Sequence, residues 1–92
     1  MPEDTPSHGY HSREIPRGTW QEFSKIEEEF LEAKDAYEQG VSIMLLTELS
    51  DLYGAIEGYL AKHHPDISME DLKLMHDRTS ASFELGHRVP RK

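Results

Sequence analysis

The sequence predicts an all-α domain: an antiparallel helical hairpin plus a third helix, completed as a helical bundle by oligomerisation. Three observations support this prediction. Apolar residues recur at alternating steps of three and four over two long segments, which is the spacing of one helix face. A single glycine, Gly40, separates the two segments and is typical of a helix end. No run of residues alternates with a period of two over the length of a strand.

The first helical segment begins near Trp20 and ends at Gly40. We expect its apolar stripe to face the rest of the domain. That stripe contains Phe23, Ile26, Phe30, Ala33 and Tyr37. The second segment begins at Ser42, a predicted N-cap, and its broader stripe predicts burial on more than one side. The broader stripe contains Leu45, Leu46, Leu49, Leu52, Tyr53, Ile56, Tyr59 and Leu60.

A third helix is predicted after Pro65. Ser68 is followed three residues later by Asp71, a spacing that resembles a capping box. Apolar residues continue the helix beyond this start, and Gly86 and Pro90 end it.

The N-terminal residues 1–19 are predicted to form an arm that is partly disordered. They contain three prolines and two glycines and almost no apolar periodicity. Ile15 is expected to anchor the end of the arm. The chain therefore divides into an arm at 1–19, a helical domain at 20–88 and a C-terminal tail at 89–92.

Composition excludes several classes of protein. The formal net charge of -8 argues against general nucleic-acid binding, which needs a basic face. The chain has no cysteine, which favours a reducing compartment, and we expect a cytoplasmic location. No apolar run has the length of a membrane span, so a soluble protein is predicted. A hydrophobic content of 36% is modest for a self-sufficient core, so a partner subunit is expected.

Two pairs of acidic residues carry the functional prediction. Glu29 and Glu32 lie in the first helix, and Glu48 and Asp51 lie in the second. Each pair has i, i+3 spacing, which places both acids on one flank of its helix. The inner acid of each pair is eight residues from Gly40 and the outer acid eleven, so the pairs are level in an antiparallel hairpin.

Each pair also begins one residue before a residue of the apolar stripe, Phe30 or Leu49. The pairs therefore occupy equivalent angles on the two helices, and we expect all four acids to converge. Converging carboxylates repel one another unless some of them are protonated or a hard cation neutralises them. Mg²⁺ prefers oxygen ligands and accepts phosphate oxygens, so phosphate chemistry is the predicted activity. The alternative is an acidic, solvated helix face, since the first helix is acidic along much of its length.

These motifs resemble those of the MazG-like all-α nucleotide pyrophosphohydrolases, which carry ExxE followed by ExxD. The resemblance rests on residues 25–33 and 48–52, and it extends from about Gly18 to Arg88 through Thr79, Phe83 and Gly86. It makes the predicted domain at 20–88 a MazG-like helical domain. The chain departs from longer relatives because it lacks a sizeable fourth helix and a second copy of the domain.

The resemblance implies a Mg²⁺-dependent enzyme, with Mn²⁺ as a substitute ion, that forms a homodimer or homotetramer. It implies that this enzyme releases pyrophosphate from a nucleotide substrate. By match to the motif, the predicted catalytic and metal-ligating residues are Glu29, Glu32, Glu48 and Asp51.

Three cations are candidate phosphate-binding residues. Arg78 and Arg88 lie in and after the third helix, and a guanidinium can bind phosphate in a bidentate manner. Lys25 precedes Glu29 by one turn, and it either contacts a phosphate or pairs with a neighbouring glutamate. His8 and His11 have the spacing of helical metal ligands, but their segment shows no helix, so no metal site is predicted there.

The predicted function is hydrolysis of a nucleoside triphosphate to its monophosphate and pyrophosphate, in nucleotide-pool cleaning or recycling. One alternative is a non-catalytic helical dimerisation or regulatory protein. Another keeps the chemistry but acts on phosphoribosyl-ATP or a guanosine alarmone. The spacing of the acids does not separate these substrates.

Overall fold

The computed structural model describes the backbone of residues 11–84 and the side chains of residues 11–80. It contains three helices: α1 (Phe23–Gln39), α2 (Ser42–His63) and α3 (Met69–Glu84). No strand occurs within residues 11–84, so the predicted all-α class is confirmed for this part of the chain. Within the same range, no helix has the length and apolar character needed to cross a membrane.

The end of α1 is built around Gly40, as the sequence predicts. Gly40 has a left-handed backbone with φ of 75°, which glycine adopts at little cost. Its N–H donates to the carbonyl of Tyr37, and the N–H of Val41 donates to that of Ala36. These two bonds form a Schellman motif, which satisfies carbonyls that the helix leaves open. The chain therefore reverses within two residues.

The N-terminal ends of α2 and α3 can be compared with the predicted caps. Val41, rather than Ser42, occupies the N-cap of α2, so the predicted cap is wrong by one residue. At α3, the Asp71 N–H donates to Ser68 Oγ over 3.1 Å, and the Ser68 N–H donates to Asp71 Oδ2 over 2.8 Å. This reciprocal pair confirms the capping box.

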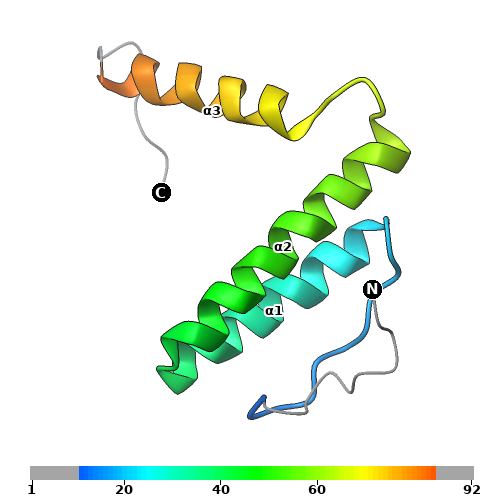
Figure 1. Cartoon of the computed structure of the whole chain (residues 1–92), viewed down its shortest axis with the longest axis vertical. Coiled ribbons are helices and arrows are strands. Elements are labelled where there is room, and N and C mark those ends of the chain that lie inside the picture. Colours follow the sequence, from blue (N-terminus) through cyan, green and yellow to red (C-terminus); the bar gives the residue numbers. More distant parts are fainter. Residues whose placement is uncertain (1–10, 85–92) are drawn as a thin grey trace.

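The helices α1 and α2 lie side by side, and α3 projects from the far end of α2 (Figure 1). The Cα radius of gyration is 15.6 Å, against about 12 Å for a compact domain of this length. Among the described helices, α1 and α2 are the pair that packs extensively together.

The face of α1 that is buried is not its apolar stripe. Large members of that stripe are exposed, with Phe30 exposed by 55%. The buried face lies about 120° away, at 100° per residue, and consists mainly of charged and small residues. Its members are Lys25, Glu28, Glu29, Glu32, Ala33, Asp35 and Ala36. The predicted inward orientation of the stripe is therefore wrong, because the acids and not the aromatic residues occupy the interior.

Residues 11–22 precede α1 in the sequence and form no helix or strand of their own. Ile15 is buried, so its predicted role as an anchor is confirmed. The Gly18 N–H donates to Glu28 Oε1 over 2.8 Å. The ring of Trp20 packs against Gly58 of α2. Residues 11–22 therefore contact both helices. The arm residues 1–10 and the C-terminal tail at 89–92 lie outside the described residues.

Candidate metal centre

Three glutamates of α1 line the interior beside α2. Glu29 is exposed by only 1%, and Glu28 and Glu32 are also buried. Their spacing of one and three residues places them on one face of the helix, where their carboxylate oxygens lie within 4.8 Å of one another. The buried face of a helix normally carries apolar side chains. Burial of like charges is costly, so this face is built for something other than packing.

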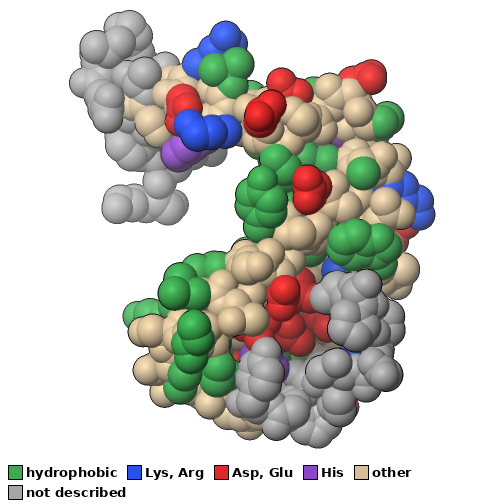
Figure 2. All heavy atoms as spheres, viewed as in Figure 1, with side chains coloured by type: hydrophobic (Ala, Val, Ile, Leu, Met, Phe, Trp, Pro, Cys, Tyr) green, Lys and Arg blue, Asp and Glu red, His purple; other side chains and the backbone are tan. Residues whose placement is uncertain are grey.

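The predicted pair of α2 completes the cluster. Glu48 is exposed by 1% and Asp51 is half-buried. Oxygens of Glu29, Glu48 and Asp51 lie within 4.8 Å of one another, so the two helices bring their acid pairs together. Glu29 belongs both to this group and to the group within α1, which joins all four predicted acids in one cluster. Acidic side chains gather over the α1–α2 pair in Figure 2.

One buried carboxylate oxygen of the cluster tests whether these residues fit a cation. Glu29 Oε1 is buried and accepts no hydrogen bond from the described residues. A buried oxygen without a donor costs roughly 1–3 kcal/mol. A divalent cation held by oxygen ligands removes that cost, and the donor set here consists of carboxylates, which Mg²⁺ prefers. The residues present therefore fit a Mg²⁺ ion.

Lys25 lies at the base of the same cluster. Its Nζ atom is 3.1 Å from Glu28 Oε1 and 3.2 Å from Glu29 Oε2, and the side chain is buried. Burial lowers the pKa of Lys25, but the hydrogen bonds to Glu28 and Glu29 outweigh it and raise the pKa. The structure thus places Lys25 in ion pairs with its neighbours, which is the second of the two predicted roles.

The cluster shifts the protonation of its acids. Burial, a hydrogen bond to Glu29 and the nearby charges of Glu29 and Glu48 raise the pKa of Glu32 to about 9. Burial also raises the pKa of Glu29. At Asp51, burial and the charge of Glu48 raise the pKa. Without a cation, the folded protein therefore retains a proton on Glu32 at neutral pH.

A histidine of the arm joins the cluster, which the sequence analysis did not predict. The His11 side chain is exposed by 4% and lies 2.9 Å from Asp35 Oδ2 and 3.3 Å from Glu48 Oε2. The sequence predicts no metal site at His11, because its segment forms no helix. An extended segment brings it to the acids instead. No local spacing signals this long-range contact.

Asp35 is the buried acid that holds the arm. Its carboxylate accepts hydrogen bonds from the N–H and hydroxyl of Ser12 and from Gln39, and it pairs with Arg13. Burial would raise the pKa of Asp35, but hydrogen bonds from Ser12, Gln39 and His11 lower it far below its ordinary value. Asp35 therefore stays ionised.

Of the two remaining predicted cations, the structure describes only Arg78. Arg78 is exposed on α3, the helix that projects away from the α1–α2 pair. Arg88 lies outside the described residues.

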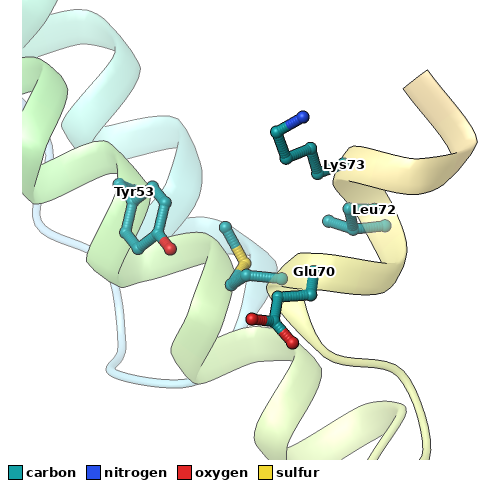
Figure 3. Close-up of a pocket in the computed structure, with 5 residues that line it drawn as sticks. Tyr53, Glu70, Leu72 and Lys73 are labelled. Atoms are coloured by element: carbon teal, nitrogen blue, oxygen red, sulfur yellow. The ribbon is translucent and has the colours of Figure 1, made fainter. Parts of the chain in front are cut away.

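A separate hollow lies in the angle between α2 and α3, with a volume of about 400 Å³. Figure 3 shows Tyr53 of α2 facing Glu70, Leu72 and Lys73 of α3 across it. Met69 completes the lining. This hollow is mainly apolar and contains none of the four predicted metal ligands.

Comparison with known proteins finds no similar protein. No protein-family model matches the chain, and searches of curated proteins and of solved structures find no match. The resemblance to MazG-like enzymes therefore rests on the motif residues themselves.

Proposed function

We propose that the protein is a Mg²⁺-dependent nucleoside triphosphate pyrophosphohydrolase, with Glu29, Glu32, Glu48 and Asp51 as the metal ligands. The observation that carries this proposal is the buried convergence of the four acids, one of which has an oxygen with no hydrogen-bond donor. A fold that places these acids in its interior, and aromatic residues on its surface, has a site that a cation stabilises.

The residues of the cluster have different roles in the proposed hydrolysis. When bound, Mg²⁺ supplies charge for the phosphates and the leaving pyrophosphate and acidifies the attacking water. Lys25 holds Glu28 and Glu29 in place through its ion pairs, so these carboxylates keep their orientation when substrate arrives. A carboxylate of the cluster that is ionised in the metal-bound site is suited to accept the proton of the attacking water.

The α1–α2 pair forms, in this proposal, an antiparallel hairpin completed as a bundle in a homodimer or homotetramer. Large apolar side chains on both helices are exposed in the single chain, which supports such an assembly. A neighbouring copy then provides the outer wall of the nucleotide pocket. In this proposal Arg78, which is exposed on α3, contacts the substrate phosphates bound by a neighbouring copy.

The test is pyrophosphate release by the purified full chain. The panel contains canonical and modified nucleoside triphosphates, phosphoribosyl-ATP and guanosine tetraphosphate, each with Mg²⁺ and with chelator. Mg²⁺-dependent pyrophosphate from a nucleoside triphosphate supports the proposal, in a role such as nucleotide-pool cleaning. If only phosphoribosyl-ATP or guanosine tetraphosphate is turned over, that compound replaces the nucleoside triphosphate as the assigned substrate. If no compound of the panel releases pyrophosphate but Mg²⁺ still stabilises the fold, the hydrolase proposal fails. The alternative of a helical regulatory protein is then favoured.

A further inference from the structure

The arm histidine lies between two buried carboxylates on different helices. His11 Nδ1 is 2.9 Å from Asp35 Oδ2 of α1, and His11 Nε2 is 3.3 Å from Glu48 Oε2 of α2. Its side chain is exposed by 4%. The ring is therefore enclosed, with one nitrogen turned to each helix.

Asp35 fixes the orientation of this ring. Because its carboxylate is held by Ser12 and Gln39, it offers a fixed acceptor 2.9 Å from His11 Nδ1, which favours the tautomer with the proton on Nδ1. A histidine that donates Nδ1–H to a carboxylate presents its Nε2 lone pair on the other side. This carboxylate–histidine pairing is the usual support for a metal-binding imidazole, because it sets the tautomer and makes Nε2 more basic.

Nε2 is turned toward carboxylates that are themselves metal ligands in the proposed function. Ligand atoms of His11, Glu32 and Glu48 lie within 4.8 Å of one another. Glu48 also belongs to the group formed with Glu29 and Asp51. The two groups of three ligands share Glu48, and Glu32 is a ligand of both proposed sites, which is the arrangement of two adjacent cations bridged by carboxylates.

We propose that His11, Glu32 and Glu48 form a second cation site beside the Mg²⁺ site, one that takes a divalent ion accepting a nitrogen ligand, with Mn²⁺ as its probe. The inference rests on the proposed function for the role of Glu48. Imidazole suits transition metals, whereas Mg²⁺ takes oxygen ligands almost exclusively. The second site therefore selects Mn²⁺ over Mg²⁺, and the arm becomes part of the active site.

The direct test is pulsed electron paramagnetic resonance of Mn²⁺ bound to the full chain, which detects a coordinated imidazole nitrogen. We expect nitrogen coupling in the wild type and its loss in His11→Gln, whose amide still donates to Asp35. His64→Gln, at the far end of α2, is the matched control and keeps the coupling. Calorimetry should show Mn²⁺ affinity at this site falling by about tenfold or more in His11→Gln.

A second variant localises the nitrogen without altering the site. The chain has six histidines, and a variant that keeps His11 and replaces the other five by Gln should retain the coupling. Absence of coupling in the wild type, or its loss in this variant, would overturn the proposal and leave His11 as a hydrogen-bonding bridge. Pyrophosphate release without nitrogen coupling would refute the second site alone. Nitrogen coupling without pyrophosphate release would refute the hydrolase and leave the second site standing.

Discussion

At the residue scale, the molecule buries its acids more deeply than its aromatic side chains. Glu29 and Glu48 are almost fully enclosed, whereas Phe30 and Tyr37 are exposed on the same α1–α2 pair. Removing a carboxylate from water without a partner costs several kcal/mol. Lys25 offsets part of this cost for Glu28 and Glu29, and the raised pKa of Glu32 offsets another part by protonation. A bound cation would offset the remainder.

Glu48→Gln should reduce Mg²⁺-dependent pyrophosphate release by more than about a hundredfold, the usual loss when one charge-stabilising group is removed. It should leave the helix content unchanged and the metal-free melting temperature equal or higher, because one repelling charge is gone. Steady-state kinetics and circular dichroism measure both effects. Glu57→Gln, at an exposed position of α2, is the control and should retain full activity. Unchanged turnover in Glu48→Gln would remove this residue from the site.

The metal-free protein should lose stability as the pH rises from about 5 to 9. The folded-state pKa of Glu32, about 9, lies above the ordinary value of 4.5. The folded chain therefore holds a proton that the unfolded chain releases, so the stabilisation is complete below pH 4.5 and is lost as the pH approaches 9. The shifts at Glu29 and Asp51 have the same sign. Melting temperatures measured in chelator across this range give the slope.

Glu32→Gln is the control for this pH dependence, because it fixes the neutral form. Its slope should be flatter than that of the wild type. Saturating Mg²⁺ should flatten the wild-type slope as well, since the cation replaces the proton. A wild-type stability that rises with pH over this range would contradict the buried, protonated Glu32.

At the element scale, the extended segment 11–22 acts as a support for α1. Gly18 illustrates how closely it approaches the helix. A Cβ atom on Gly18 would lie 2.2 Å from the backbone oxygen of Ser24, a contact that only a backbone shift can relieve. The Gly18 N–H also holds Glu28 Oε1, so that shift would disturb the carboxylate cluster.

Gly18→Ala should therefore destabilise the protein by about 1–3 kcal/mol, as overpacking usually does. Urea denaturation measures the change. Gly54→Ala is the matched control, because its added methyl group meets no atom within 4 Å. That control should gain up to about 1 kcal/mol from the higher helix propensity of alanine. Equal effects at both positions would show that segment 11–22 does not pack on α1 as described.

The sequence predicted the helices well because their signals are local. Gly40 and the Ser68–Asp71 pair each act within one turn, and both appear as predicted. The equal spacing of the acid pairs from Gly40 also predicted that the two pairs lie close together. The buried face of α1 was not predictable from hydropathy, because charged residues fill the interior. The contact between His11 and Glu48 joins residues far apart in sequence, and a single sequence carries no signal for it.

At the scale of the whole molecule, exposed apolar side chains are the dominant feature. Those of α2 include Ile43, Leu46, Leu49 and Tyr53, and a second exposed group surrounds Phe30 on α1. Apolar surfaces of this kind mark interfaces between chains. These apolar faces are where we expect a second copy to pack in the proposed assembly.

Leu46→Glu should weaken self-association, since a charge at a side chain exposed by 61% in the single chain would be buried in the assembly. We expect the dissociation constant to rise by about tenfold or more, as seen by sedimentation velocity. Thr47→Glu adds the same charge at the next residue, about 100° round the helix, and should have little effect. Identical association in wild type and Leu46→Glu would exclude this face from the interface.

The shift of the melting temperature by Mg²⁺ would establish whether Glu29, Glu32, Glu48 and Asp51 form one Mg²⁺ site. Because the ion binds only the assembled site, Mg²⁺ at about a hundred times its dissociation constant should add about 2.7 kcal/mol of stability. We expect a clear rise in the wild type and a much smaller one in Asp51→Asn. Equal shifts in the two proteins, or no shift in either, would rule out this Mg²⁺ site.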